Sequence, residues 1–441
     1  MRSLPQSLDV RRGMRGQQGT AMILVIVVLA ALTFLGVIGS RSALTELQMT
    51  RQDVLSKQAL GVAEAGLNHA YRLVVASGGF SNELAGGGTG GTLAGIGSVA
   101  TLDGASYRFR AFGGGASDGY YVEAQDDFDE LTGANDPTVD KNLRIYLVSR
   151  GRVGGAERVV TASVSGTSLF PYAIFADRFI TMSGGSLTDS FDSRTAPYNA
   201  LTAGSDAGVR TGGTNGTGDV TLTGGSTRVN GDATAGVGTV SAPAGGVTGT
   251  TTSNGPTMSY PPVPSCWAAN GNQYSNSTGI TLIGGSTYGG VATGVLNVSG
   301  NSQNVILASN RSYCFNTITL QGGGTLTVNG PVTISVTGAV NFSGGSVSNT
   351  TALATNLLLY SSMNAPTNQN AIKLSGGSAA YMAVYAPQAG ITMSGGTSDF
   401  YGAVIGASVT DTGGIGVHYD DALAGIMSAV GQLTGWHEVR N

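Results

Sequence analysis

Charged side chains, the groups that most enzymes use for acid–base chemistry, are scarce in this sequence. They make up 11% of its 441 residues, and Arg311 is the only one between Asp232 and Lys373. A polysaccharide lyase or hydrolase needs paired carboxylates, a metal or an aligned base on one face of its fold. Most of the C-terminal half lacks these groups, so we expect no catalytic site there.

The exception is a group of titratable residues around His418. Asp420 and Asp421 follow it after one intervening residue, and Asp399 and Asp411 precede it on what we expect to be neighbouring coils. A histidine beside carboxylates can act as a base or bind a metal, but neither an HExxH pattern nor a nucleophile elbow is present. A hydrogen-bonded structural role is the simpler interpretation.

The other two histidines, His69 and His437, have no partner in the local sequence and are expected to be structural. The chain is therefore not expected to be an enzyme. A membrane-tethered carbohydrate-active enzyme is the least favoured alternative, and loss of polysaccharide cleavage in His418→Ala would support it.

An acidic stretch near the middle of the N-terminal half is a candidate for calcium binding. Its carboxylates are Asp126, Asp127, Asp129, Glu130, Asp136 and Asp140. Carboxylate oxygens are the ligands that Ca²⁺ prefers, but the spacing does not match an EF-hand loop. A solvated acidic loop between two strands is the favoured interpretation, and no other cofactor is predicted.

Two cysteines, Cys266 and Cys314, are the only thiols. Neither lies in a CxxC pattern or in a metal-ligand spacing, so they form either a disulfide or two inert thiols. An oxidising compartment outside the cytoplasm would favour the disulfide.

The element that decides the location of the chain lies at its N-terminus. Residues 20–40 carry no charge, and a helix of this length spans about 31 Å, the thickness of a bilayer core. Arg2, Arg11, Arg12 and Arg15 precede it, so the positive-inside rule leaves residues 1–19 in the cytoplasm. We predict a single-pass protein of the cytoplasmic membrane, with most of the chain periplasmic or extracellular. A cleaved signal peptide is disfavoured, since its apolar segment would be shorter.

Helical spacing of apolar residues continues beyond the membrane as far as Gly78 and Gly79. The pattern predicts one helix of about 57 residues, about 85 Å long. Only its first third fits in lipid, so the rest must pack against a folded domain or against neighbouring copies.

Residues 17–67 resemble the N-terminal region of PilX-type minor pilins of type IV pilus systems. The most specific parts are the Gln-Gln-Gly at 17–19, Arg41, Ser42, Glu46, the polar residues 51–53 and the Ala-Glu-Ala-Gly at 63–66. The resemblance implies that prepilin peptidase cuts after Gly19, that Thr20 becomes the new N-terminus, and that other pilin subunits and the pilus assembly machinery are partners.

One position departs from that family. The fifth residue of most mature pilins is a Glu, whereas Leu24 stands here. The resemblance then implies a tip or initiation position rather than a main structural subunit. A membrane-anchored scaffold or adhesin that never enters a filament is the alternative.

The body of the chain is predicted to be mainly β. Between residues 100 and 167, segments of alternating apolar and polar residues predict an antiparallel sheet that docks on the helix. After Pro171 a unit of the form apolar-x-apolar-(Ser/Thr)-Gly-Gly recurs, with final steps near 20 residues. Such a period is typical of a solenoid with glycines at its corners. We predict a right-handed parallel β-helix, with a β-sandwich as the alternative; residues 370–425 are also similar to a β-helical domain of unclear role.

The expected organisation is a leader at 1–19, a transmembrane and stem helix at 20–77, a pilin-like antiparallel region at 78–170, a Gly-rich repeat domain at 171–430 and a C-terminal tail at 431–441. A net charge of −4 gives no basic surface for nucleic acid. Hydroxyl and amide side chains with aromatic residues predict a surface that could bind a glycan or solid surface. The aromatic candidates are Tyr274, Tyr288, Tyr381, Tyr385 and Tyr401.

Overall fold

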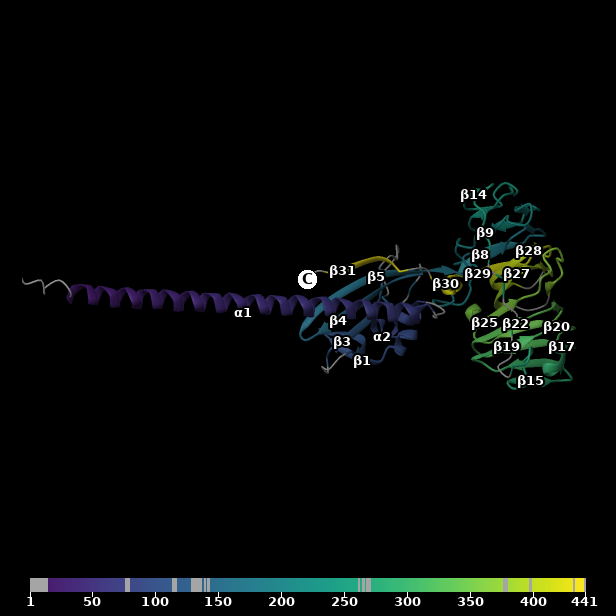
Figure 1. Cartoon of the computed structure of the whole chain (residues 1–441). Helices are drawn as coiled ribbons and strands as arrows, with labels where there is room; N and C mark the ends of the chain where they lie inside the picture. The colour runs from purple at the N-terminus through teal and green to yellow at the C-terminus, as the bar shows by residue number, and fades with distance from the viewer. Residues whose placement is uncertain are drawn as a thin grey trace, which may run out of the picture.

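The computed structural model describes residues 15–75, 80–112, 117–127, 137–138, 140, 143–260, 262–263, 266, 271–375, 380–395, 399–430 and 433–439. A long helix projects from a small sheet, and a tall stack of strands lies beyond that sheet (Figure 1). The predicted mainly β fold with one long N-terminal helix and an antiparallel sheet is confirmed.

Helix α1 (Arg15–Val74) is 60 residues long and divides into two parts by burial. Every residue from Met22 to Val54 is exposed. Beyond that point a stripe at helical spacing is buried against the sheet, and its members are Ala59, Ala63, Leu67, Ala70 and Val74. The helix therefore has a free stem and a docked end.

The sheet under the docked end contains five antiparallel strands in chain order: β1 (Ser98–Leu102), β2 (Ala105–Ala111), β3 (Gly119–Asp126), β4 (Arg144–Val153) and β5 (Ala156–Ser168). Before them, α2 (Ser81–Gly88) and the 3₁₀ helix η1 (Gly91–Gly95) pack beside α1. Gly151 on β4 lets the helix approach closely, since a Cβ there would lie 2.1 Å from the Ala59 carbonyl oxygen.

Two strands from the C-terminal end complete this sheet. Strands β30 (Met427–Val430) and β31 (Thr434–Val439) both pair antiparallel with β5. Residues 431–441 were expected to form a separate tail, but their described part, 433–439, contains strand β31 of this sheet. The whole stack of residues 169–426 is inserted between strands of one sheet.

The stack has three walls of strands. The first wall contains β6 (Ile174–Ala176), β9 (Val209–Thr211), β12 (Ala233–Thr234), β14 (Thr251–Thr252), β19 (Arg311–Phe315), β22 (Val332–Val336), β25 (Leu357–Ser361) and the first halves of β27 (Ala380–Met393) and β28 (Phe400–Asp411). The second wall contains β7 (Phe179–Met182), β10 (Asp219–Leu222), β13 (Val240–Ser241), β17 (Val295–Ser299), β20 (Thr317–Gln321), β23 (Val340–Ser343), β26 (Ile372–Ser375) and the second halves of β27 and β28.

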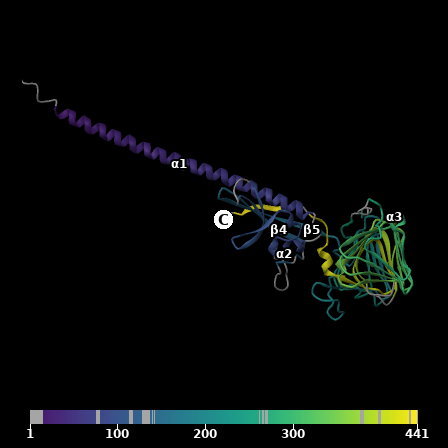
Figure 2. The same cartoon turned by 90° about the horizontal axis from the view of Figure 1, so that it is seen from below.

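The third wall is formed by β15 (Ile280–Ile283), β18 (Asn304–Leu307), β21 (Thr325–Val328) and β24 (Ser346–Asn349), and higher up by β29 (Gly416–Asp420), β8 (Leu187–Phe191) and β11 (Arg228–Val229). Pairing along each wall is parallel except at one end of the stack. There β15 pairs antiparallel with β18, and β16 (Thr287–Tyr288) pairs antiparallel with β17. Short helices α3 (Gly290–Thr293), η2 (Ala354–Asn356) and η3 (Asp421–Gly425) lie at corners and connections. Viewed along the stack, the strands enclose a closed outline (Figure 2).

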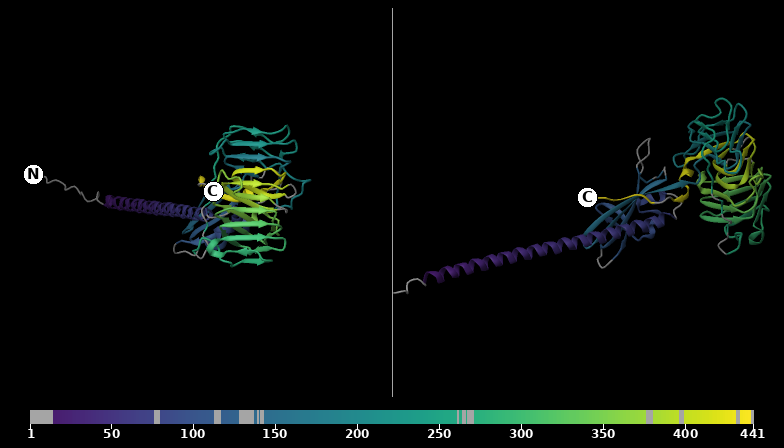
Figure 3. Two further views of the ribbon diagram at one scale, coloured as in Figure 1. Left: turned by 90° about the vertical axis from the view of Figure 1, so that its right-hand side faces the viewer. Right: turned by 45° about the horizontal axis from the view of Figure 1, so that its top comes forward.

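The chain enters the stack in its middle rather than at an end. Strands β6, β7 and β8 pair with β28 and β29, the last strands of the stack. From there the chain rises to β14, crosses the full height to β15, and climbs back to the starting level (Figures 1 and 3). We call the boundary of β6–β8 with β28 and β29 the seam.

Alternating side chains fill the interior of the stack. In β20 and β22 every second residue is buried, and the interior is made mainly of Val, Ile, Leu and Phe. The Gly-Gly repeats supply the corners: Gly184, Gly284 and Gly344 have φ values of 77°, 69° and 70°. This left-handed conformation costs glycine little and other residues more, which explains the recurrence of the repeat.

Candidate functional site

Most of the exposed large hydrophobic side chains among the described residues lie on α1. From Met22 to Ile38 the side chains are apolar except for Thr33, and all of them stand free around the helix. Among the described residues, α1 is the one helix long and apolar enough to cross a membrane. Gly19 and Thr20 lie in its first turns. A helix that is apolar all round needs lipid or other helices around it.

Beyond the apolar part, the stem carries a few charges before it reaches the sheet. Arg41, Glu46 and Arg51 are exposed, whereas Asp53 and Lys57 pair with each other at 2.8 Å. Leu44, Leu47 and Met49 lie between these charges and are also exposed, so they extend the free apolar surface of the helix. This segment is amphipathic and suits the zone where the helix leaves the lipid.

The two cysteines are joined in a disulfide with a Cα–Cα distance of 5.8 Å. Cys266 belongs to a segment whose described residues, 253–260, 262, 263, 266 and 271–279, lie along the outside of the first wall, and Cys314 lies on β19 of that wall. The same segment is held elsewhere by Tyr260, whose ring lies 4.5 Å from Phe175 and 6.0 Å from Tyr385. This crossing segment therefore covers the first wall like a strap, and we call it the strap.

The predicted calcium candidates are only partly described. Asp126 is buried at the end of β3, and Asp127 lies 3.7 Å from the Arg144 guanidinium. Asp129 and Glu130 lie outside the described residues. Within the described part of the chain, no group of three His, Cys, Asp or Glu residues is arranged to hold a metal.

Asp140, from the same acidic stretch, has a structural role. Its carboxylate accepts hydrogen bonds from the backbone amides of Leu143 (3.2 Å) and Arg144 (3.0 Å). Burial raises its pKa to about 7, because a carboxylate away from water is penalised in its charged form.

His418 lies in a buried group of side chains at the seam. Its Nδ1 is 2.5 Å from Asp189 Oδ1, and its Nε2 is 3.7 Å from Asp399 Oδ1. The Tyr198 hydroxyl donates to the other oxygen of Asp189 at 2.8 Å. Asp189 and His418 are adjacent in the strand register, as are His418 and Tyr401.

The remaining members of the predicted cluster do not touch the imidazole. Asp420 Oδ1 accepts hydrogen bonds from the amides of Ser193 and Ala422, both at 3.1 Å. Burial raises the pKa of Asp421 to about 7 and that of Asp411 to about 6. The decisive partner of His418 is thus Asp189, which lies 229 residues away in the sequence.

Aromatic rings extend this group into a column. Tyr381 and Tyr401 stack with centroids 4.3 Å apart, and the His418 ring follows 4.9 Å from Tyr401. The other proposed glycan-contact tyrosines have internal roles: Tyr385 is buried, and the Tyr288 hydroxyl donates to the Ser275 carbonyl at 2.5 Å. The column leaves a half-exposed carboxylate, Asp399, at its side.

His69 and His437 make the structural contacts expected of them. His69 Nδ1 is 2.7 Å from the Tyr120 hydroxyl, and His437 contacts the Thr161 hydroxyl and the Gly435 carbonyl.

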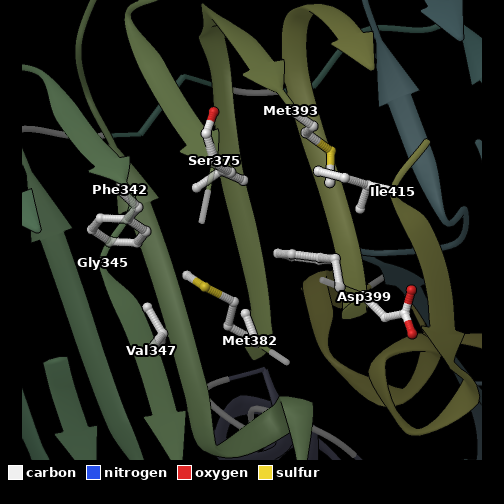
Figure 4. A pocket seen from close by; sticks show the side chains of 11 residues that line it. Phe342, Gly345, Val347, Ser375, Met382, Met393, Asp399 and Ile415 are labelled. Atoms are coloured by element: carbon white, nitrogen blue, oxygen red, sulfur yellow. The ribbon is translucent and has the colours of Figure 1, made fainter. Parts of the chain in front are cut away.

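A small hollow opens beside Asp399 on the inner side of the wall (Figure 4). Its volume is about 40 Å³ and its lining is largely apolar, with Met382, Met393 and Phe400 among the contributing side chains. A space of this size holds about one water molecule, so it offers no room for a saccharide.

The second wall carries a row of polar side chains that are mostly half-buried. One position on each of nine neighbouring strands is in register across it, and the residues are Ser241, Thr221, Thr181, Thr410, Thr392, Lys373, Asn341, Thr319 and Asn297. Strands β17, β20 and β28 of this wall lie on the side of the stack away from α1 (Figure 1). This wall is therefore the distal face of the protein.

The N-terminal part of the chain is similar to a known protein family. Residues 18–68 match the family described as PilX N-terminal. These residues form a PilX-type N-terminal region. The match covers the exposed stem and the first part of the docked helix, and it supports a minor pilin related to type IV pili that is anchored by a single apolar helix.

Other comparisons add little to the PilX-type assignment. Residues 296–426 match a domain of unknown function, DUF7305, which coincides with the half of the stack that climbs from β17 to the seam. The competence-associated pilin ComZ from Thermus thermophilus is similar with a TM-score of 0.30 and 13% identity, over 87% of this chain and 97% of that chain; a similarity this low carries no argument here. Comparison with curated proteins gives no significant match.

Proposed function

We propose that this chain is a minor pilin-like subunit of a type IV pilus or a related pseudopilus, with a structural rather than enzymatic role. The observation that carries the proposal is the continuity of α1. One helix runs from a fully exposed apolar stem, matched by the PilX N-terminal family, into a sheet that covers its other end. Such a helix can leave the bilayer for a filament because apolar neighbouring helices replace lipid.

Processing at the N-terminus belongs to the same proposal. Prepilin peptidase would cut between Gly19 and Thr20, leaving the apolar stem intact. The arginines of the leader would hold it in the cytoplasm until then, with the sheet and the stack on the outer side of the cytoplasmic membrane.

The inserted stack is proposed to be a right-handed parallel β-helix that serves as a display domain. Parallel pairing along three walls and left-handed glycines at the corners support this description. The strap covers the first wall, whereas the row of hydroxyl and amide side chains and Lys373 on the distal second wall would face a surface or a glycan, apart from the buried Thr410 hydroxyl. Tip display or surface adhesion would use this wall.

A permanently anchored scaffold or adhesin is the second candidate. Leu24 favours it, since this position lacks the carboxylate found in most mature pilins. The two candidates differ in the fate of the leader and in the fraction where the protein is found.

N-terminal sequencing of the protein recovered from membranes and from sheared surface filaments separates them. A start at Thr20 in the filament fraction supports the pilin proposal. Gly19→Leu should block cleavage and keep the protein in the membrane, while Gly36→Leu, a change within the stem where a side chain meets no other atom, should leave cleavage unchanged. An intact leader found only in membranes would establish the anchored scaffold instead.

A further inference from the structure

An open apolar groove lies where the docked end of α1 meets the sheet. Its volume is about 430 Å³. Apolar side chains line it from Val62 and Ala65 of α1, Val153 of β4 and Phe112, which is 63% exposed. Gly61 keeps the groove open, since a Cβ at this position would meet no atom within 4 Å. The groove therefore has room for apolar side chains of another chain.

A basic hollow continues the groove along α1. Its volume is about 340 Å³, and Ala65 lines both spaces. The other lining residues are Asn68, His69 and Arg72 of α1 and Arg110 of β2. Burial, and after it the charges of Arg110 and Arg72, lower the pKa of His69, because nearby positive charge disfavours a further cation. The hollow is thus suited to a carboxylate.

The charges of the hollow have a counterpart on the exposed stem. The ion pairs of the described residues include neither Arg72 nor Arg110, and they do not include Glu46. Arg72 follows Glu46 by 26 residues on one continuous helix, which is a distance of about 39 Å. The carboxylate and the guanidinium groups can therefore meet only between two copies of the chain.

The residues on either side of Glu46 determine which way a second stem would lie. Residues 32–39 precede it and are apolar except for Thr33, whereas Asp53 and Lys57 follow it. With Glu46 in the basic hollow, a parallel helix places residues 32–39 along the groove, and an antiparallel helix places the charged residues there. Burying apolar side chains is favourable and burying charges is costly. Only the parallel arrangement matches the stem to the groove.

We propose that the groove and the basic hollow receive the stem of a second copy of this chain, parallel to α1 and displaced along it by about 39 Å, with Glu46 of that copy beside Arg72 and Arg110. This inference rests on the proposed pilin function, because the displacement lifts the second stem out of the bilayer. One copy offers the groove and the other the stem, so the contact is heterologous and can repeat. Copies anchored at one depth in a membrane would not make it.

Photo-cross-linking of the full chain in its native host tests the contact. A residue with a benzophenone side chain replaces Phe112, and sheared filaments and membranes are analysed by peptide mapping after irradiation. In filaments we expect a cross-link to residues 30–42 of a second copy, with a yield at least fivefold higher than in membranes. A chain that starts at Thr20 in filaments but is cross-linked there to no second copy would overturn this contact and leave the pilin proposal intact. Absence of the chain from filaments would overturn both.

Charge reversals test whether the hollow selects Glu46. Arg110→Glu and Glu46→Arg should each lower the cross-link yield at least fivefold, and the two changes in one chain should restore it, since opposite charges meet again. Arg228→Glu, an exposed charge reversal on the stack, is the matched control and should leave the yield unchanged. Gly61→Leu should also remove the cross-link, because its side chain fills the groove. An unchanged yield in both Arg110→Glu and Glu46→Arg would overturn the proposal.

Discussion

The amide of Leu169 donates a hydrogen bond of 2.6 Å to the carbonyl of Ile426. These two residues are the entrance and the exit of the inserted stack, so the chain leaves the first sheet and returns to it at one point. Strand β5 ends just before this point, and β30 and β31 follow it. All three belong to one sheet, because β5 pairs with both β30 and β31.

Removal of the stack should leave a folded stem and sheet. Replacing residues 170–425 by a short Gly-Ser linker keeps the core under α1, since the buried residues of that core, and Met427 and Leu433 packed against it, all lie outside the deleted range. We expect the shortened protein to insert in the membrane and to resist limited proteolysis in the sheet region. Complete digestion of the sheet would show that it depends on the stack.

The contact of Gly151 with the helix should be sensitive to a single methyl group. In Gly151→Ala the new Cβ would meet the Ala59 carbonyl and the Ala63 amide at 2.1 and 2.4 Å, and overpacking of this kind costs about 1–3 kcal/mol. Gly61→Ala is the matched control. Gly61 lies on α1, the helix that Gly151 contacts, and a Cβ added there has no atom within 4 Å, so this change should alter the free energy of unfolding by less than about 1 kcal/mol. Thermal unfolding in detergent measures both.

Loss of the disulfide should free the strap. The bridge closes a loop with a sequence separation of 48, which corresponds to about 4 kcal/mol in the chain-entropy account. We expect Cys266→Ser with Cys314→Ser to lower the unfolding temperature and to expose the strap to proteases before the sheet. Non-reducing peptide mapping of the exported protein checks the bridge directly, and two free thiols would contradict it.

Asp411 should make the stack less stable as pH rises through the weakly acidic range. Burial raises its pKa from 3.8 to about 6, so the folded protein keeps a proton that the unfolded chain has already released. The free energy of unfolding therefore falls between about pH 4 and pH 6, by at most about 3 kcal/mol for this group. Asp140 and Asp421, whose pKa values burial raises to about 7, add to the fall. Asp411→Asn should therefore reduce the fall without abolishing it, whereas Asp103→Asn, at an exposed carboxyl, should leave it unchanged. Unfolding curves at pH 4, 5, 6 and 7 give the comparison.

The elements with a local signal could be predicted from sequence. The uncharged run and the continuing helical period define α1, and alternation between residues 100 and 167 defines the antiparallel strands. The Gly-Gly repeat correctly marks corners. In each case neighbouring residues carry the pattern, so no knowledge of distant contacts is needed.

The contacts that bring distant segments together could not be predicted. The sequence groups His418 with Asp399, Asp411, Asp420 and Asp421, yet its closest partner is Asp189, and Tyr198 comes from a connecting loop without any repeat. Likewise nothing in the segment 434–439 indicates that it pairs with β5. In a parallel stack, residues of different coils become neighbours through the register of the paired strands. That register depends on where the chain enters the stack.

The entry in the middle of the stack has a consequence for export. Strand β6 has no neighbour on its lower side until β28 is in place, because β28 is the strand that pairs with it there. In this pairing Ile174 lies opposite Val404. With the proposed topology, about 230 residues have to cross the membrane before the first coil acquires its second neighbour. Unpaired strand edges invite association with other chains, so a chain arrested at this stage would present an open β edge, and the last strands to arrive are the ones that close it.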